Sequence, residues 1–309
     1  MIVPSKKWSW LRVLFQIRGT VLPMIWRRVL ATTLFAILLT WLHARYGWFQ
    51  ISLTPLPFTV LGLALSIFLG FRNSTSYDRF WEGRKLWGQL VNTSRSLARQ
   101  CLSYFKSESE KPALRSLQEE IIRLQIAYAH ALRLHLRQQN MEGLSPWLSP
   151  QQAEAVRQSN NVPVYLMQEI SDRLALACQK DWLNPLHLPL LEERVHELSI
   201  LQGGCERILK TPIPFAYIGL MHQLVVLYCF ALPFGLGEHW QAPLLVAVIS
   251  YAFLGLDAIG DSIENPFDIA PNDLPLEAIC RTIESNLLEL IGETDLPPPL
   301  VPNQKGILL

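Results

Sequence analysis

Residues 51–71 read ISLTPLPFTVLGLALSIFLGF and carry no charged side chain. A helix can cross the hydrocarbon core of a bilayer when about 20 consecutive residues are mostly apolar. Pro55 and Pro57 stand near the start of the stretch, where a helix tolerates proline. The stretch therefore predicts a transmembrane helix and indicates that this chain is a membrane protein.

Three further apolar stretches have a similar length. They cover residues 29–47 (VLATTLFAILLTWLHARYG), 211–237 and 240–256. Trp41 and Tyr46 lie toward the end of the first, as in the aromatic belt at a membrane interface. We expect an all-α membrane protein with four transmembrane helices, two within residues 29–71 and two within residues 211–260.

The composition agrees with a membrane protein and excludes other classes. Only 17% of the 309 residues are charged, against about 25% in soluble domains. The net charge of +1 gives no long-range field that would attract nucleic acid. The five cysteines are scattered and odd in number, which favours neither a disulfide framework nor a zinc site. We expect no nucleic-acid partner, no metal and no cofactor.

The residues between the two apolar pairs, 72–210, are rich in charge and predict a helical cytoplasmic domain. Residues 112–137 show the periodicity of an amphipathic helix best. Residues 261–309 predict a cytoplasmic C-terminal helix followed by an extended, proline-containing tail, TDLPPPLVPNQKGILL. The apolar stripe of residues 112–137 consists of Leu117, Ile121, Leu124, Tyr128, Leu132 and Leu136.

The distribution of basic residues predicts the orientation in the membrane. Residues 1–28 and 72–85 are rich in lysine and arginine, whereas the loops at residues 51–56 and 238–242 contain neither. Basic residues remain on the cytoplasmic side, so we expect both termini and the middle region in the cytoplasm. Residues 1–28 predict a retained cytoplasmic segment, because no small-residue cleavage site follows. Their basic residues are Lys6, Lys7, Arg12, Arg18, Arg27 and Arg28.

An enzyme is not expected. The sequence contains no P-loop, GxGxxG, GxSxG, HExxH or EF-hand pattern. His130 and His135 are five residues apart and miss the i, i+4 face of a helix.

The second span has two chemically different faces. Small residues recur at spacing four, which lets helices approach closely in lipid. Bulky residues form a neighbouring stripe, which faces either lipid or a central axis. Periodicity alone favours lipid or ordinary packing for the bulky stripe. The small stripe is Gly62, Ser66 and Gly70, and the bulky stripe is Leu63, Ile67 and Phe71.

Four polar residues lie near the second pair of spans. His222 lies inside the third span, and an ionisable residue in the membrane is a candidate functional site, although a hydrogen-bonded neutral histidine fits as well. Asp257, Asp261 and Glu264 follow the fourth span on one helical face. They are expected to mark a helix end at the cytoplasmic boundary, with a cation site as the alternative.

Three long segments of the chain resemble the bestrophin family, specifically its bacterial branch. They read FLGFRNSTSYDRFWEGRKLWGQL (68–90), GGCERILKTPIPFAY (203–217) and ENPFDIAPNDLPLEAIC (264–280). The resemblance implies a homopentameric ion channel of the bacterial inner membrane, with one central pore. It also implies that Leu63, Ile67 and Phe71 form a hydrophobic neck and that Leu186 forms a cytoplasmic aperture.

The chain departs from the animal branch of this family after the NPF motif. Animal members have consecutive acidic residues there that bind calcium, whereas here Asp268 and Asp273 are separated by four residues. Calcium takes about six to eight oxygen ligands, so we expect no calcium gate.

Selectivity and mechanism are less constrained by the sequence. An apolar neck gates by dewetting, and Arg72, Asp78 and Arg79 give mixed charges beside it. The family contains channels for anions and for monovalent cations, and we favour cations for a bacterial member. A secondary transporter is an alternative, but the second pair of spans does not repeat the first. A non-conducting membrane sensor is the other alternative.

Overall fold

The computed structural model describes residues 1, 17, 19–46, 54–236, 240–303 and 306–308. The basic residues at positions 6, 7, 12 and 18 lie outside the described residues, and so do residues 51–53 and 238–239 of the two predicted outer loops. Among the residues that are described, the sole β-type pairing is an isolated bridge between Phe105 and Leu183. The predicted all-α class is confirmed.

The chain divides into two compact units. The membrane unit consists of residues 4–80 and 212–265, and the polar unit of residues 1–3, 81–211 and 266–309. One helix of 50 residues, α3 (Pro55–Tyr104), contributes to both.

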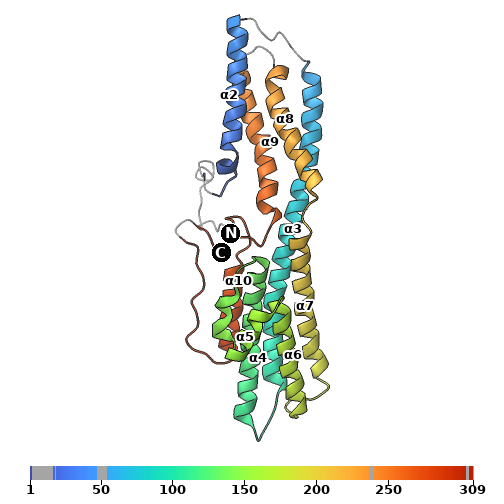
Figure 1. Ribbon diagram of the computed structural model, residues 1–309, viewed down its shortest axis with the longest axis vertical. Helices are drawn as coiled ribbons and strands as arrows, with labels where there is room; N and C mark the ends of the chain where they lie inside the picture. Colours follow the sequence, from blue (N-terminus) through green and yellow to red (C-terminus); the bar gives the residue numbers. More distant parts are fainter. Residues whose placement is uncertain (2–16, 18, 47–53, 237–239, 304–305, 309) are drawn as a thin grey trace. The chain divides into compact units, whose positions relative to one another are not determined.

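The membrane unit contains α2 (Leu22–Tyr46), the first part of α3, α8 (Phe215–Leu236) and α9 (Ala242–Glu264). All four helices are long and apolar enough to cross a bilayer, which confirms the predicted number of spans. Helices α2 and α8 both pack against α9 (Figure 1). One face of α3 joins this core through two buried leucines. Leu69 packs with Ile25, Val225, Cys229, Leu254 and Ala258, and Leu65 with Ala36, Tyr228, Leu232 and Val246.

Two membrane helices extend beyond their apolar stretches. Helix α3 continues past Phe71 without a break, because no proline occurs between Pro57 and Pro112 to interrupt its hydrogen bonds. Helix α9 continues past Leu256 and ends at Glu264. Hydropathy thus locates the apolar core of each helix but not its end.

The polar unit is built around α4 (Lys111–Leu136), which packs against η1 (Met141–Trp147), α6 (Val162–Gln179), α7 (Leu188–Lys210) and α10 (Leu276–Leu290). The short helix α5 (Pro150–Gln158) packs against η1. Proline occupies the first turn of α4, α6 and α7, where its missing N–H costs no hydrogen bond.

The apolar stripe predicted for residues 112–137 is confirmed as the buried face of α4. All six of its residues are buried. Polar contacts add to this packing, since the Tyr128 hydroxyl donates to the Leu198 carbonyl at 2.8 Å. After α10, residues 296–303 form no regular secondary structure. Ser285 of α10 donates to the carbonyl of Pro297 at 3.2 Å, so the tail begins along that helix.

Candidate functional site

The bulky stripe of α3 is uncovered in the single chain. Leu63, Ile67 and Phe71 are 64%, 51% and 64% exposed, whereas Leu65 and Leu69 between them are buried against the other membrane helices. Leaving three large apolar side chains in water is unfavourable by roughly 1.5–3 kcal/mol each. This face is therefore covered either by lipid or by other subunits.

The small residues beside this stripe do not share one environment. A Cβ atom added at Gly62 would lie 2.5 Å from the Tyr228 hydroxyl, so Gly62 admits α8 of the same chain. Ser66 donates its hydroxyl to the Gly62 carbonyl at 2.8 Å. Gly70 has nothing within 4 Å of such an added atom. Gly62 thus serves packing within the chain, and Ser66 and Gly70 remain exposed.

Leu186 lies in the polar unit, in the turn between α6 and α7. Its side chain is 80% exposed. The turn is held by the backbone N–H of Leu186, which donates to the Asn184 side chain at 2.9 Å. A bulky aliphatic residue is thus presented at the surface on a locally fixed backbone.

A buried ion-pair cluster lies in the membrane unit, directly after Phe71. The Arg72 guanidinium is fully buried, and one Nη atom lies 2.6 Å from the Asp257 carboxylate, which is 2% exposed. Its other Nη atom pairs with Asp261. The backbone carbonyl of Leu256 accepts a hydrogen bond from the neighbouring Asn73 at 3.0 Å. Helices α3 and α9 are therefore joined by a charged, desolvated contact.

His222 of α8 completes the cluster. Its Nδ1 lies 2.5 Å from the Asp257 carboxylate and its Nε2 3.6 Å from the Asp261 carboxylate. The imidazole thus contacts both of the carboxylates that pair with Arg72.

The ligand atoms of His222, Asp257 and Asp261 lie within 4.8 Å of one another and could hold a metal ion. Arg72 pairs with both aspartates, however, so each carboxylate already has a positively charged partner inside the protein. We therefore interpret the cluster as a structural ion-pair network.

The three acidic residues of α9 make more contacts with other helices than a helix end at a membrane boundary requires. Asp257 and Asp261 lie inside α9, and Glu264 is its last residue. The Glu264 side chain accepts from the backbone N–H of Ile213 at 3.2 Å, and its carbonyl accepts from Arg79 at 3.1 Å. Glu264 thus marks the predicted helix end. Asp257 and Asp261 lie within the helix instead, and they contact Arg72 of α3 and His222 of α8, which are far away in the sequence.

The segment after the NPF motif lies in the polar unit and is held by an arginine. Arg137 donates to the carbonyls of Phe267 at 3.1 Å, Asp268 at 3.4 Å and Leu274 at 3.5 Å. Asp273 is buried and accepts from the Ala270 N–H at 2.5 Å, and this burial raises the pKa of its carboxyl to about 6. The carbonyls thus have a guanidinium partner, and Asp273 loses its charge readily.

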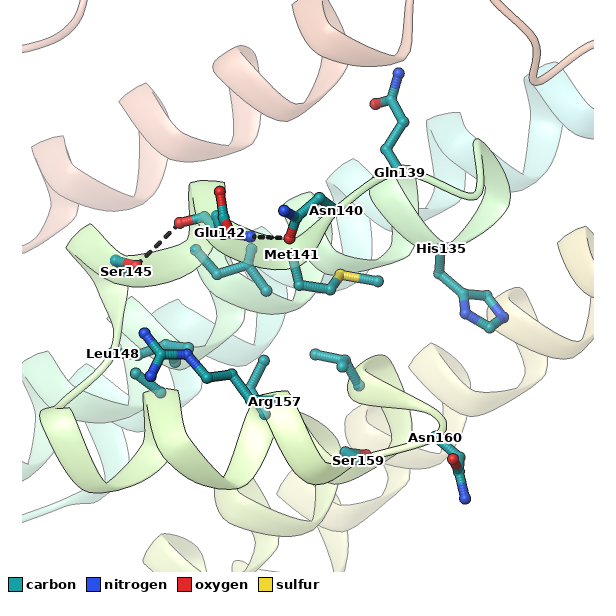
Figure 2. A pocket seen from close by; sticks show the side chains of 14 residues that line it. His135, Gln139, Asn140, Met141, Glu142, Ser145, Leu148, Arg157, Ser159 and Asn160 are labelled. Carbon is teal, nitrogen blue, oxygen red and sulfur yellow. Dashed lines mark hydrogen bonds between the residues drawn. The ribbon is translucent and has the colours of Figure 1, made fainter.

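A cavity of about 410 Å³ lies in the polar unit, between η1, α5 and the end of α4 (Figure 2). Its two basic side chains already have acidic partners. His135 pairs with Glu206 at 3.2 Å and Arg157 with Glu154 at 3.2 Å. Glu142 is the remaining charged residue of the lining, and this set of side chains identifies no ligand.

Four of the five cysteines, Cys101, Cys205, Cys229 and Cys280, are buried, and Cys178 is half-buried. Burial raises the pKa of the Cys101, Cys205 and Cys280 thiols to about 12. All five are free.

The four spans and the ion-paired contact between them define a helical multi-span membrane protein. A family model described as Bacterial/Fungal Bestrophin protein matches residues 1–289. The voltage-dependent anion channel-forming protein YneE of Escherichia coli (strain K12) is 39% identical over 307 residues, 98% of each chain. A protein of the same description from Nostoc sp. is 38% identical over 295 residues, 94% of each chain.

Solved structures give the same result. A crystal structure of a bacterial Bestrophin homolog from Klebsiella pneumoniae has a TM-score of 0.82 and 34% sequence identity, and the match covers 87% of this chain and 99% of that chain. The chain belongs to the bacterial and fungal bestrophin family, which confirms the resemblance.

Proposed function

We propose that this protein is an ion channel formed by several copies of the chain, with five subunits as the family resemblance implies. The observation that carries the proposal is the uncovered stripe of Leu63, Ile67 and Phe71 on a helix whose opposite face is buried. In a closed ring of subunits, such a stripe on each copy lines the central axis. The relatives named as channel-forming proteins support this arrangement.

The stripe gates ions by excluding water. Three successive apolar rings line a passage that does not hold a continuous water column when narrow, and an ion that enters must shed hydration at a cost of several kcal/mol. Widening of the neck restores the water and lets ions pass. Ser66 and Gly70 are small and uncovered beside the stripe, which lets neighbouring copies of α3 approach one another.

The channel conducts monovalent ions and opens without calcium. The carbonyls of Phe267, Asp268 and Leu274 already have a guanidinium as their partner. We assign Leu186 to a second constriction at the cytoplasmic exit, as the family resemblance implies, and the 80% exposure of its aliphatic side chain supports this assignment. The protein resides in the bacterial inner membrane with both termini in the cytoplasm, as its basic residues predict.

The test compares two matched triple variants in planar bilayers. Replacement of Leu63, Ile67 and Phe71 by alanine should raise unit conductance or open probability, because the rings widen. Leu30, Leu34 and Leu38 on α2 have the same spacing of four and similar exposure. Their replacement by alanine is the control and should leave unit currents unchanged.

Three outcomes would contradict the proposal. Equal unit currents in the two triple variants would indicate that the α3 stripe faces lipid. Substrate-coupled flux without unit current steps would indicate a secondary transporter, and no flux at all would indicate a sensor.

A further inference from the structure

Within the membrane unit, α3 carries only three charged residues, Arg72, Asp78 and Arg79. They alternate in sign in the sequence and therefore give no preference for anions or cations by themselves. In the structure the aspartate lies on a different face of the helix from the two arginines, and the three side chains differ in their partners. This separation determines which charge an ion near the neck encounters.

Helical geometry places one of the three beside the apolar stripe. At about 100° per residue, Asp78 lies about 20° from the centre of the arc formed by Leu63, Ile67 and Phe71. Arg72 and Arg79 lie about 140° and 120° from that centre. Ser74, also exposed, falls between Phe71 and Asp78 on the same arc.

The contacts of the two arginines agree with this geometry. Arg72 is fully buried and paired with Asp257 and Asp261. Arg79 is partly buried and donates to the carbonyl of Glu264. Asp78 is exposed, and none of the described residues forms an ion pair with it. Both positive charges are thus drawn toward α9, and the negative charge is left on the stripe side.

We infer that Asp78 is a specificity-determining residue, which forms a ring of carboxylates beside the neck and favours monovalent cations over anions. This inference rests on the proposed function, since it requires the stripe to face the pore. Seven residues of helix place Asp78 about 10 Å beyond Phe71. Rings of aspartate are a known means of cation selection.

The distance is suited to electrostatic selection. Charges are screened over about 8 Å at physiological ionic strength, and less strongly where low-dielectric walls surround them. A potential of one to two kT at the mouth of the neck would change the local ratio of cations to anions by roughly one order of magnitude. The effect should weaken as salt is raised.

The experiment measures reversal potentials in asymmetric NaCl for the full-length protein in planar bilayers. Asp78→Asn should lower the sodium-to-chloride permeability ratio at least about threefold, and Asp78→Lys should lower it further. Asp78→Glu should retain the native ratio. Glu289→Gln removes an exposed carboxylate of α10 in the polar unit and serves as the control, with no change expected.

The outcomes separate this inference from the proposed function. If the native protein and all variants give unit currents with one permeability ratio, the Asp78 ring is refuted and the apolar neck stands. If Glu289→Gln shifts the ratio as much as Asp78→Asn does, the effect belongs to overall charge, and the inference also fails. If the native protein gives no unit currents, the channel proposal itself is wrong, and the inference about Asp78 is refuted as well.

Discussion

Arg72 should be among the most important single residues for the stability of the membrane unit. Its guanidinium is fully buried, and its partner Asp257 is 2% exposed. Arg72→Met keeps most of the side-chain volume but removes the guanidinium, so the buried Asp257 carboxylate keeps only the His222 imidazole as a side-chain partner. Breaking one side of a buried ion pair costs about 3–5 kcal/mol, and at roughly 2–3 °C per kcal/mol this lowers the apparent Tm by about 6–15 °C.

The assay is thermal unfolding of the detergent-purified protein at one fixed scan rate, because membrane proteins often unfold irreversibly. Arg207→Met is the control, since it breaks an exposed pair with Glu82 that contributes at most about 1 kcal/mol. Arg72→Met combined with Asp257→Asn should recover much of the loss, because no unpaired charge stays buried. A double variant as unstable as Arg72→Met, or an Arg72→Met loss no larger than that of Arg207→Met, would refute this reasoning.

Three further outcomes are expected. Gly62→Ala should lower the free energy of unfolding by about 1–3 kcal/mol, because its Cβ would lie 2.5 Å from the Tyr228 hydroxyl. Gly70→Ala is the control and should be nearly neutral, because its Cβ would meet nothing within 4 Å. Thermal unfolding of the two variants measures the difference. The carboxyl of Asp273 has its pKa raised from 3.8 to about 6, so the folded state binds the proton more tightly and stability falls as pH rises from about 4 to about 6.5, by roughly 2–3 kcal/mol. Asp273→Asn should abolish that part of the pH dependence and Asp268→Asn should not, and equal melting profiles of the two variants from pH 4 to 8 would exclude this cause. Bilayer currents should be the same in trace and micromolar calcium, and a steep, reversible activation would contradict the calcium independence proposed above.

Local sequence patterns predict the helices of this protein well. The stripe of α4 and the four apolar stretches are visible because helix periodicity and span length depend only on neighbouring residues. Helix ends are predicted less well, since α3 passes Phe71 and α9 passes Leu256 without a local signal to stop or to continue.

The ion-pair cluster shows that contacts between distant parts of the chain cannot be predicted from a single sequence. Arg72 and Asp257 are 185 residues apart, and nothing in either segment identifies the partner. The spacing of Asp257 and Asp261 did predict a shared helical face, which is the face that meets Arg72. The sequence alone predicts an Arg72 charge next to the bulky stripe, whereas the structure shows this guanidinium paired with two carboxylates of α9.

The bulky stripe of α3 shows a different limit. The spacing of Leu63, Ile67 and Phe71 predicts one exposed face, and the structure of one chain shows that face uncovered. Whether lipid or sister subunits cover it depends on molecules outside the chain. A central pore is implied by the family resemblance and cannot be predicted from local periodicity.

The burial of the native thiols makes this protein a convenient background for chemical labelling. Only the thiolate reacts with maleimides or methanethiosulfonates, and burial holds Cys101, Cys205 and Cys280 in the protonated form. Changing the half-buried Cys178 to serine would remove the most accessible of the five. A single new cysteine at Leu63 or Ile67 would then report, through its rate of modification, when water enters that stretch of helix.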